Sequence, residues 1–186
     1  KRANKLGIKG TEDLSLDWPT VIARKDAIVA SWSKGKNATP AKLGIPVLPG
    51  RGVFAGRNEI NVSERNYTAD KFVIAIGSKP ARPAIPGAEL GITSDELIHL
   101  KEQPKQFVII GGGFIGLEFA FALAWAGTKV TILQSGPQIA PAVDDEIREL
   151  LLESAKQAGI AVKTNVKVKS IGAHKTVQAE IDGRVE

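Results

Sequence analysis

One glycine-rich hexapeptide is the stretch of this sequence best suited to chemistry. It reads Gly111-Gly112-Gly113-Phe114-Ile115-Gly116 and matches the spacing G-x-G-x-x-G. In a strand–turn–helix context this spacing binds the pyrophosphate of a dinucleotide. The first glycine permits a tight turn, the second lets the backbone approach the phosphates, and the third lets the helix pack closely on the strand. A helix that starts there also offers unpaired N–H groups to the phosphates.

The flanking residues predict the elements that would position this turn. Residues 107–110 are apolar and β-branched, which is typical of a buried strand. Residues 117–126 contain no Pro or Gly and predict a buried helix that Gly127 ends. Residues 129–134 predict a second strand and complete a β-α-β unit. The alternative is a structural turn that binds no ligand.

Upstream, the spacing of apolar residues predicts a helix over 14–32 with Pro19 near its start, where proline is tolerated. Residues 1–9 read as the end of another helix, and residues 34–42 as a polar loop with breakers. Alternation of period two then predicts a small antiparallel meander that leads into a buried core strand. The expected strands are residues 45–48, 52–54, 59–62 and 71–76.

Downstream, residues 76–87 are expected to be extended because of their prolines, and to cross between domains. Residues 93–97 predict a helix start. A helix over 146–157 is expected to bury one apolar stripe formed by Ile147, Leu150, Leu151 and Ala155. Residues 160–162 predict a third strand of the same sheet, and residues 166–171 and 176–181 a hairpin.

Composition excludes several classes of protein. The 186 residues could form one large domain or parts of two, and the missing initiator Met is expected of a piece of a longer chain. The absence of Cys removes thiol chemistry and disulfides, and the two His residues have no metal-ligand spacing. The net charge is +5, but the basic residues form no dense run. We therefore interpret them as solvated surface residues, which could also favour an anionic cofactor. We expect no nucleic acid, no membrane span, no secretory signal and a cytoplasmic protein.

Three segments, in order, resemble one family. Residues 72–80, with Pro83, Ile85, Pro86 and Gly87, are similar to the motif A-T-G-S-x-P followed by P-x-I-P-G. Residues 92–95 resemble a lead-in to a nicotinamide domain, and residues 111–118 resemble G-G-G-Y-I-G-x-E. Asp17-Trp18 and residues 50–54 extend the likeness to nearly the whole chain. The family is that of the class I pyridine nucleotide–disulfide oxidoreductases, such as glutathione reductase, dihydrolipoamide dehydrogenase and mercuric reductase.

The resemblance implies an α/β fold with Rossmann-like FAD- and NAD(P)-binding domains and a small antiparallel meander. Residues 1–88 would be the later part of an FAD domain, 89–103 a connection, and 104–186 an incomplete NAD(P)H domain. The parent protein would pass hydride from NAD(P)H to FAD and on to a disulfide or small-molecule acceptor, and would be a homodimer. Its redox Cys pair is absent from this chain.

The resemblance also implies roles for single residues. The glycines and Ile115 would hold the NAD(P)H pyrophosphate, with Phe114 in the place of a family Tyr beside the flavin. Glu118 would serve catalysis near the nicotinamide and flavin; the alternative is a capping or salt-bridged acid. We favour the catalytic role because a lone carboxylate on an apolar helix is costly to bury. Further cofactor contacts are expected at Gly52, Ala75, Gly77 and Ser78 for FAD, and at Gln134 and Val166 for NAD(P)H.

Two positions depart from the family pattern. Ile76 stands where the family has Thr, which removes a hydroxyl. Gln134 ends the second strand of the β-α-β unit. At this position an acid would bind the ribose hydroxyls of NAD, whereas nearby Arg residues would bind the phosphate of NADP. A neutral Gln without neighbouring cations favours NADH. The other functions left open are a flavoenzyme with oxygen, a metal ion or a quinone as acceptor, and a dinucleotide-binding sensor or scaffold without turnover.

Overall fold

The structure is a computed structural model that describes residues 15–181 and 183–185. The helix end expected within residues 1–9 lies outside this part of the chain. The described residues form two compact units: residues 15–22 belong with residues from 80 onward to the first, and residues 23–79 form the second. The domain limits expected at residues 88 and 104 remain a prediction. No helix in the described part is long and apolar enough to cross a membrane.

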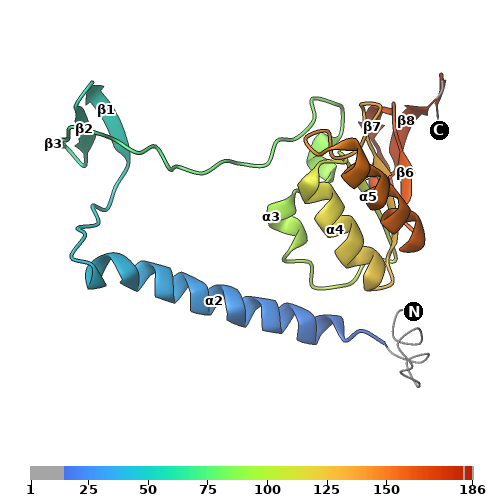
Figure 1. The fold of residues 1–186 in the computed structure, drawn as a ribbon, viewed down its shortest axis with the longest axis horizontal. Coiled ribbons are helices and arrows are strands. Elements are labelled where there is room, and N and C mark those ends of the chain that lie inside the picture. The colour runs from blue at the N-terminus through green and yellow to red at the C-terminus, as the bar shows by residue number, and fades with distance from the viewer. Residues whose placement is uncertain (1–14, 182, 186) are drawn as a thin grey trace. The chain divides into compact units, whose positions relative to one another are not determined.

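A parallel sheet with two crossover helices forms the centre of the first unit (Figure 1). The strand order is β4-β5-β6, and β5 pairs in parallel with both neighbours. The β-α-β unit and the third strand expected from the sequence are therefore confirmed. The elements are β4 (Gln106–Ile110), α4 (Phe114–Trp125), β5 (Lys129–Leu133), α5 (Asp145–Gln157) and β6 (Ala161–Lys163).

Both helices pack on one face of this sheet. The core there joins Ala120 and Leu123 of α4 to Ile132 of β5 and Ala155 of α5. The small Ala side chains let the helices approach the sheet closely. Gly127, with φ of 99°, follows the end of α4, as the sequence indicated.

An antiparallel sheet forms beside the carboxyl end of β5. Its strands are β7 (Lys167–Ile171), β8 (Val177–Ile181) and β9 (Arg184–Val185), with η2 (Ala173–Lys175) between the first two. The expected hairpin is thus confirmed. Leu133 at the end of β5 packs with Val166 and Ala179 in a second, smaller core.

The segment between residues 80 and 105 is fastened to this sheet. It contains η1 (Ala88–Leu90) and α3 (Ser94–Leu97). The Ile171 amide donates to the Pro86 carbonyl at 2.9 Å. A Cβ on Gly87, where φ is 77°, would lie 1.8 Å from the Ile171 oxygen, so glycine is required there. At α3 a capping box joins Thr93 and Glu96, which agrees with the helix start expected at residues 93–97.

The second unit holds a three-stranded meander and most of helix α2 (Trp18–Lys42). The meander strands pair antiparallel in the order β1-β2-β3, as expected: β1 (Gly52–Gly56), β2 (Glu59–Val62) and β3 (Arg65–Thr68). The sequence did not identify β3. Its tight turn uses Ser63 and Glu64 at φ of 49° and 66°, conformations usually signalled by Asn-Gly.

Three expected elements upstream are wrong. Residues 34–42 are helical, because Gly35 and Asn37 only weaken a helix and Pro40 falls in its last turn. Residues 45–48 form no strand, since Pro46 lacks an amide hydrogen and no described strand lies beside them. Residues 71–76 are neither a strand nor buried: Val73 and Ile76 are each 91% exposed. A buried parallel strand needs two neighbours, and the described residues provide none there.

The apolar stripe expected on α5 is also partly wrong. Ala155 is buried and Leu151 packs against the core, but Ile147 and Leu150 are exposed. Arg148 takes the buried position at helical spacing before Leu151 and Ala155. The helix is therefore rotated so that a charged residue faces inward.

The capping box makes the stability of the first unit depend on pH. Thr93 donates to the Glu96 carboxylate from its amide at 2.7 Å and its hydroxyl at 3.0 Å, and Arg82 adds a third bond at 2.8 Å. These bonds hold the Glu96 pKa below its ordinary value of 4.5, the Thr93 amide contributing most. A carboxylate whose pKa is lower in the folded state stabilises the fold at pH values above its unfolded pKa. This stabilisation is lost as the pH falls through the folded pKa.

We therefore expect Glu96→Gln to lower the free energy of unfolding at pH 7 but not at pH 2. Urea unfolding at the two pH values measures this difference. Glu89→Gln, which changes an exposed acid in the same segment, is the matched control. A Glu96→Gln deficit of equal size at both pH values contradicts the account.

Candidate functional site

The first and last glycines of the hexapeptide are required by the fold itself. Gly111 has φ of 111°, and its amide donates to the Leu133 carbonyl at 2.8 Å, so the turn closes directly against β5. A Cβ on Gly116 would lie 2.2 Å from the Gly111 carbonyl oxygen. This close approach lets the first turn of α4 lie against the strand–helix turn, which is the packing role expected of the third glycine.

The backbone of Gly112 is held from both sides. Its amide donates to Gln134 Oε1 at 2.8 Å, and its carbonyl accepts from the Ala140 amide at 2.8 Å. Ile139 lies against it, since a Cβ at position 112 would be 2.7 Å from Ile139 Cγ2. These contacts fix the orientation of the middle of the turn.

Gly113 differs because nothing in the described chain requires glycine there. Its φ is −75°, which any residue adopts, and a Cβ would meet no atom within 4 Å. It is exposed and stands at the N-cap of α4, where it provides no capping side chain. The first N–H groups of α4 therefore face open space beside a backbone without a Cβ. A phosphate fits this cradle by both shape and charge.

A cleft of about 820 Å³ runs along this turn. Gly113, Phe114 and Ile115 form part of its lining, and Phe114 is 73% exposed. The wall along β4 is apolar, whereas the η2 turn adds the basic side chains of His174 and Lys175. The cleft thus joins the glycine turn to an apolar surface, and a mostly apolar cleft with a few polar groups is the usual form of a small-molecule site.

The structure assigns Gln134 a task not foreseen from the sequence. Its side-chain oxygen accepts the Gly112 amide, so that atom already has a partner within the protein. Within the described part of the chain, its Nε2 group makes no hydrogen bond and remains a donor for a ligand. The residue therefore presents a donor, where an acid would present an acceptor.

Four of the expected NAD(P)H-site residues lie outside the cleft lining: Gly112, Gln134, Glu118 and Val166. Glu118 is exposed on α4, so the argument that its burial would be costly is wrong. Val166 is 2% exposed and packs against Leu133, which places its side chain inside the smaller core. The Val166 amide helps to hold the backbone of Gln134, because it donates to the Gln134 carbonyl at 3.0 Å.

The residues expected to contact FAD are not assembled into a site. Gly52 lies in β1, where a Cβ would be 2.8 Å from the terminal Cδ1 atom of Ile60, a contact that a movement of that side chain can relieve. Ala75, Gly77 and Ser78 lie in an exposed, irregular segment, and a Cβ on Gly77 would meet no atom within 4 Å. The described residues of the second unit therefore do not form an FAD cradle.

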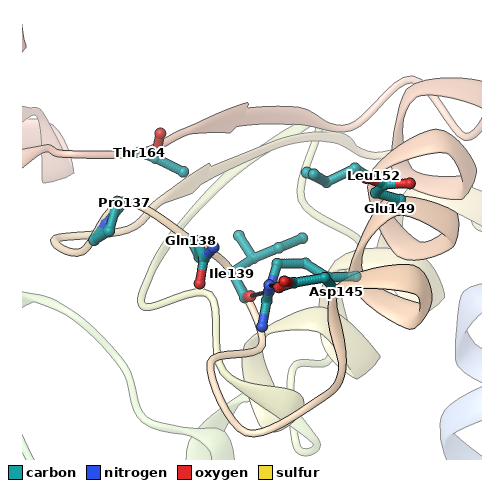
Figure 2. Close-up of a pocket in the computed structure, with 8 residues that line it drawn as sticks. Pro137, Gln138, Ile139, Asp145, Glu149, Leu152 and Thr164 are labelled. Atoms are coloured by element: carbon teal, nitrogen blue, oxygen red, sulfur yellow. Dashed lines mark hydrogen bonds and ion pairs between the residues drawn. The ribbon is translucent and has the colours of Figure 1, made fainter.

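Arg148 is the residue near the site that sequence analysis missed. It is 7% exposed, donates from Nε to the Ile139 carbonyl at 3.0 Å, and pairs with Asp145. Arg148 also lines a pocket of about 360 Å³. Figure 2 shows this pocket, with Ile139 beside Asp145 and with Glu149 nearby on α5. The sequence did contain a signal, because Arg148 lies at helical spacing before the apolar residues Leu151 and Ala155. It was missed because charged residues are almost never fully buried unless they are paired.

The glycines give a paired prediction for stability. We expect Gly116→Ala to lower the free energy of unfolding by about 1–3 kcal/mol, because its Cβ overlaps the Gly111 oxygen. Gly113→Ala should cost no more than about 1 kcal/mol, the usual range for an N-cap exchange. Denaturant unfolding of the two variants compares them directly. Equal losses contradict the assignment of Gly113 to a ligand rather than to packing.

Comparisons with known proteins show which family the chain resembles. Residues 9–185 match the family of pyridine nucleotide-disulphide oxidoreductases. The chain is 34% identical to dihydrolipoyl dehydrogenase of Acholeplasma laidlawii, over 99% of this chain and 56% of the relative. It is 38% identical to glutathione reductase of Nostoc sp., over 79% of this chain and 32% of the relative.

A solved structure shows the same fold. The HOCl-induced flavoprotein disulfide reductase RclA from Escherichia coli matches 92% of this chain and 41% of its own, with a TM-score of 0.76 and 28% identity. The chain thus spans from about a third to just over half of the proteins it resembles. Its matched residues, its fold and its glycine turn show that the chain belongs to the pyridine nucleotide-disulphide oxidoreductase family.

Proposed function

We propose that this chain binds NAD(P)H through the turn at residues 111–116, as part of an FAD-dependent NAD(P)H:disulfide-type oxidoreductase. The observation that carries the proposal is Gly113, a glycine that neither conformation nor packing explains. A bound pyrophosphate does explain it, since a Cβ would intrude on a ligand close to the backbone. When bound, NAD(P)H supplies the hydride that a flavin takes up.

The residues of this chain position the cofactor. The N–H groups at the start of α4 hold the pyrophosphate, and the positive end of the helix dipole favours its charge. From there the apolar cleft leads along β4, where the exposed ring of Phe114 provides a surface for the nicotinamide. Glu118, exposed one turn further along α4, remains our candidate for a polar contact at the nicotinamide end.

For the parent protein we propose a disulfide or similar acceptor and a homodimer. The names of the relatives support the acceptor, because they include a glutathione reductase and a flavoprotein disulfide reductase. Gly52, Ala75, Gly77 and Ser78 are our proposed FAD contacts. Since the described residues form no FAD cradle, no step of flavin chemistry follows from this chain.

We propose NADH as the preferred nucleotide, and Gln134 supports this choice. Its neutral side chain neither repels nor neutralises a ribose phosphate, and Ser135 and Gly136 add no positive charge. The 2′-phosphate of NADPH would therefore find no positively charged residue in this loop. The ribose hydroxyl of NADH can accept a hydrogen bond from Gln134 Nε2.

The first test is nucleotide binding by the chain, measured by isothermal titration calorimetry with NADH and NADPH. We expect micromolar binding that Gly113→Ala weakens by at least about tenfold, because the added methyl group occupies the pyrophosphate position. Gly35→Ala, an exchange on α2 that also meets no atom within 4 Å, is the matched control and should bind normally. A folded chain that binds neither nucleotide contradicts the proposal and favours a scaffold without turnover.

The second test concerns nucleotide choice. We expect Gln134→Glu to keep the bond to the Gly112 amide and to weaken NADPH binding at least about tenfold relative to NADH, because a carboxylate repels the 2′-phosphate. Paired calorimetric titrations of wild type and variant measure this ratio. An unchanged ratio would show that Gln134 does not face the ribose.

A further inference from the structure

We propose that Arg148 is a positioning residue for the dinucleotide turn, acting through a strained backbone at Ala140. The inference rests on the proposed function, since it concerns the turn that would bind NAD(P)H. Among the described residues, Arg148 makes its hydrogen bonds and ion pair with Ile139, Val143 and Asp145, none of which belongs to the glycine turn. Its effect passes through the loop between β5 and α5.

The guanidinium of Arg148 closes this loop. It donates from Nε to the Ile139 carbonyl at 3.0 Å and from Nη2 to the Val143 carbonyl at 2.6 Å. The two carbonyls flank Ala140 on either side in sequence. The ion pair with Asp145 adds little, because that carboxylate is largely exposed. A buried cation is costly to desolvate, so fixing a conformation is a better account of Arg148 than added stability.

The enclosed residue is held in an unfavourable conformation. Ala140 has φ of 44°, the left-handed region in which a side chain is strained. It is buried, and its carbonyl accepts from the Val143 amide at 3.1 Å. Such a conformation persists only where the surrounding structure imposes it, and such sites are commonly functional.

The strained conformation places groups against the glycine turn. The Ala140 amide donates to the Gly112 carbonyl at 2.8 Å, and the buried Ile139 side chain lies under Gly112. Gly112 immediately precedes Gly113, whose backbone would face the phosphates. Without Arg148, Ala140 would relax toward negative φ, its amide would turn away from Gly112, and the backbone of Gly112 would lose one of its two hydrogen bonds.

The test uses the full chain and NADH as the probe. We expect Arg148→Gln to weaken NADH binding about tenfold or more, since small misplacements at a site have effects of that order. Exchange of the Ala140 amide hydrogen should become faster. Adding Ala140→Gly should recover at least half of the loss on a logarithmic scale, because glycine adopts positive φ without strain. Asp145→Asn, which removes only the exposed partner of the Arg148 ion pair, is the control and should stay within about twofold of wild type.

Each outcome decides the inference. A folded Arg148→Gln variant with unchanged affinity and unchanged Ala140 exchange overturns it, as does a loss that Ala140→Gly fails to recover, because that pattern indicates general destabilisation. If wild type binds no NADH, the proposed function fails. Hydrogen exchange of the Ala140 amide in Arg148→Gln still tests whether Arg148 holds the conformation of Ala140. If Arg148→Gln does not fold, NMR of wild type decides: the inference requires positive φ at Ala140 and a hydrogen-bonded amide.

Discussion

The candidate site depends on how the backbone of one residue, Gly112, is fixed. Gln134 accepts its amide and the Ala140 amide binds its carbonyl, so the peptide planes around it have a single orientation. That orientation leaves the next residue, Gly113, without a protein neighbour for a Cβ. A turn that binds phosphate through backbone groups has no side chain to adjust, so its affinity depends on this fixed geometry.

The anchors come from elements that are far apart in sequence. Gln134 follows β5, and Ala140 lies in the loop that Arg148 of α5 closes. The parallel sheet makes this possible, because the carboxyl ends of neighbouring strands and the loops that leave them meet at one edge. The fold therefore brings the glycine turn, the end of β5 and the start of α5 together.

The central β-α-β unit could be predicted from sequence because its signals are local. An apolar run, a glycine turn and an uninterrupted apolar helix each indicate their own structure. Failures came where distant residues decide. The run at 71–76 has the composition of a buried strand, but no described strand lies beside it. The Ser63–Glu64 turn has no sequence signature. The hydrogen bond from the Gly112 amide to the Gln134 side chain could not be predicted either, because only the fold brings these two residues together.

The most direct test of the central claim is an NMR titration of the labelled chain with NADH, following its backbone amides. The account predicts that the largest shifts fall on Gly113, Phe114 and Ile115 at the start of α4, with none at Gly35. It also predicts that adenosine, which lacks the pyrophosphate, leaves these three amides unchanged. Shifts centred elsewhere, or equal shifts with adenosine, would contradict pyrophosphate binding at this turn.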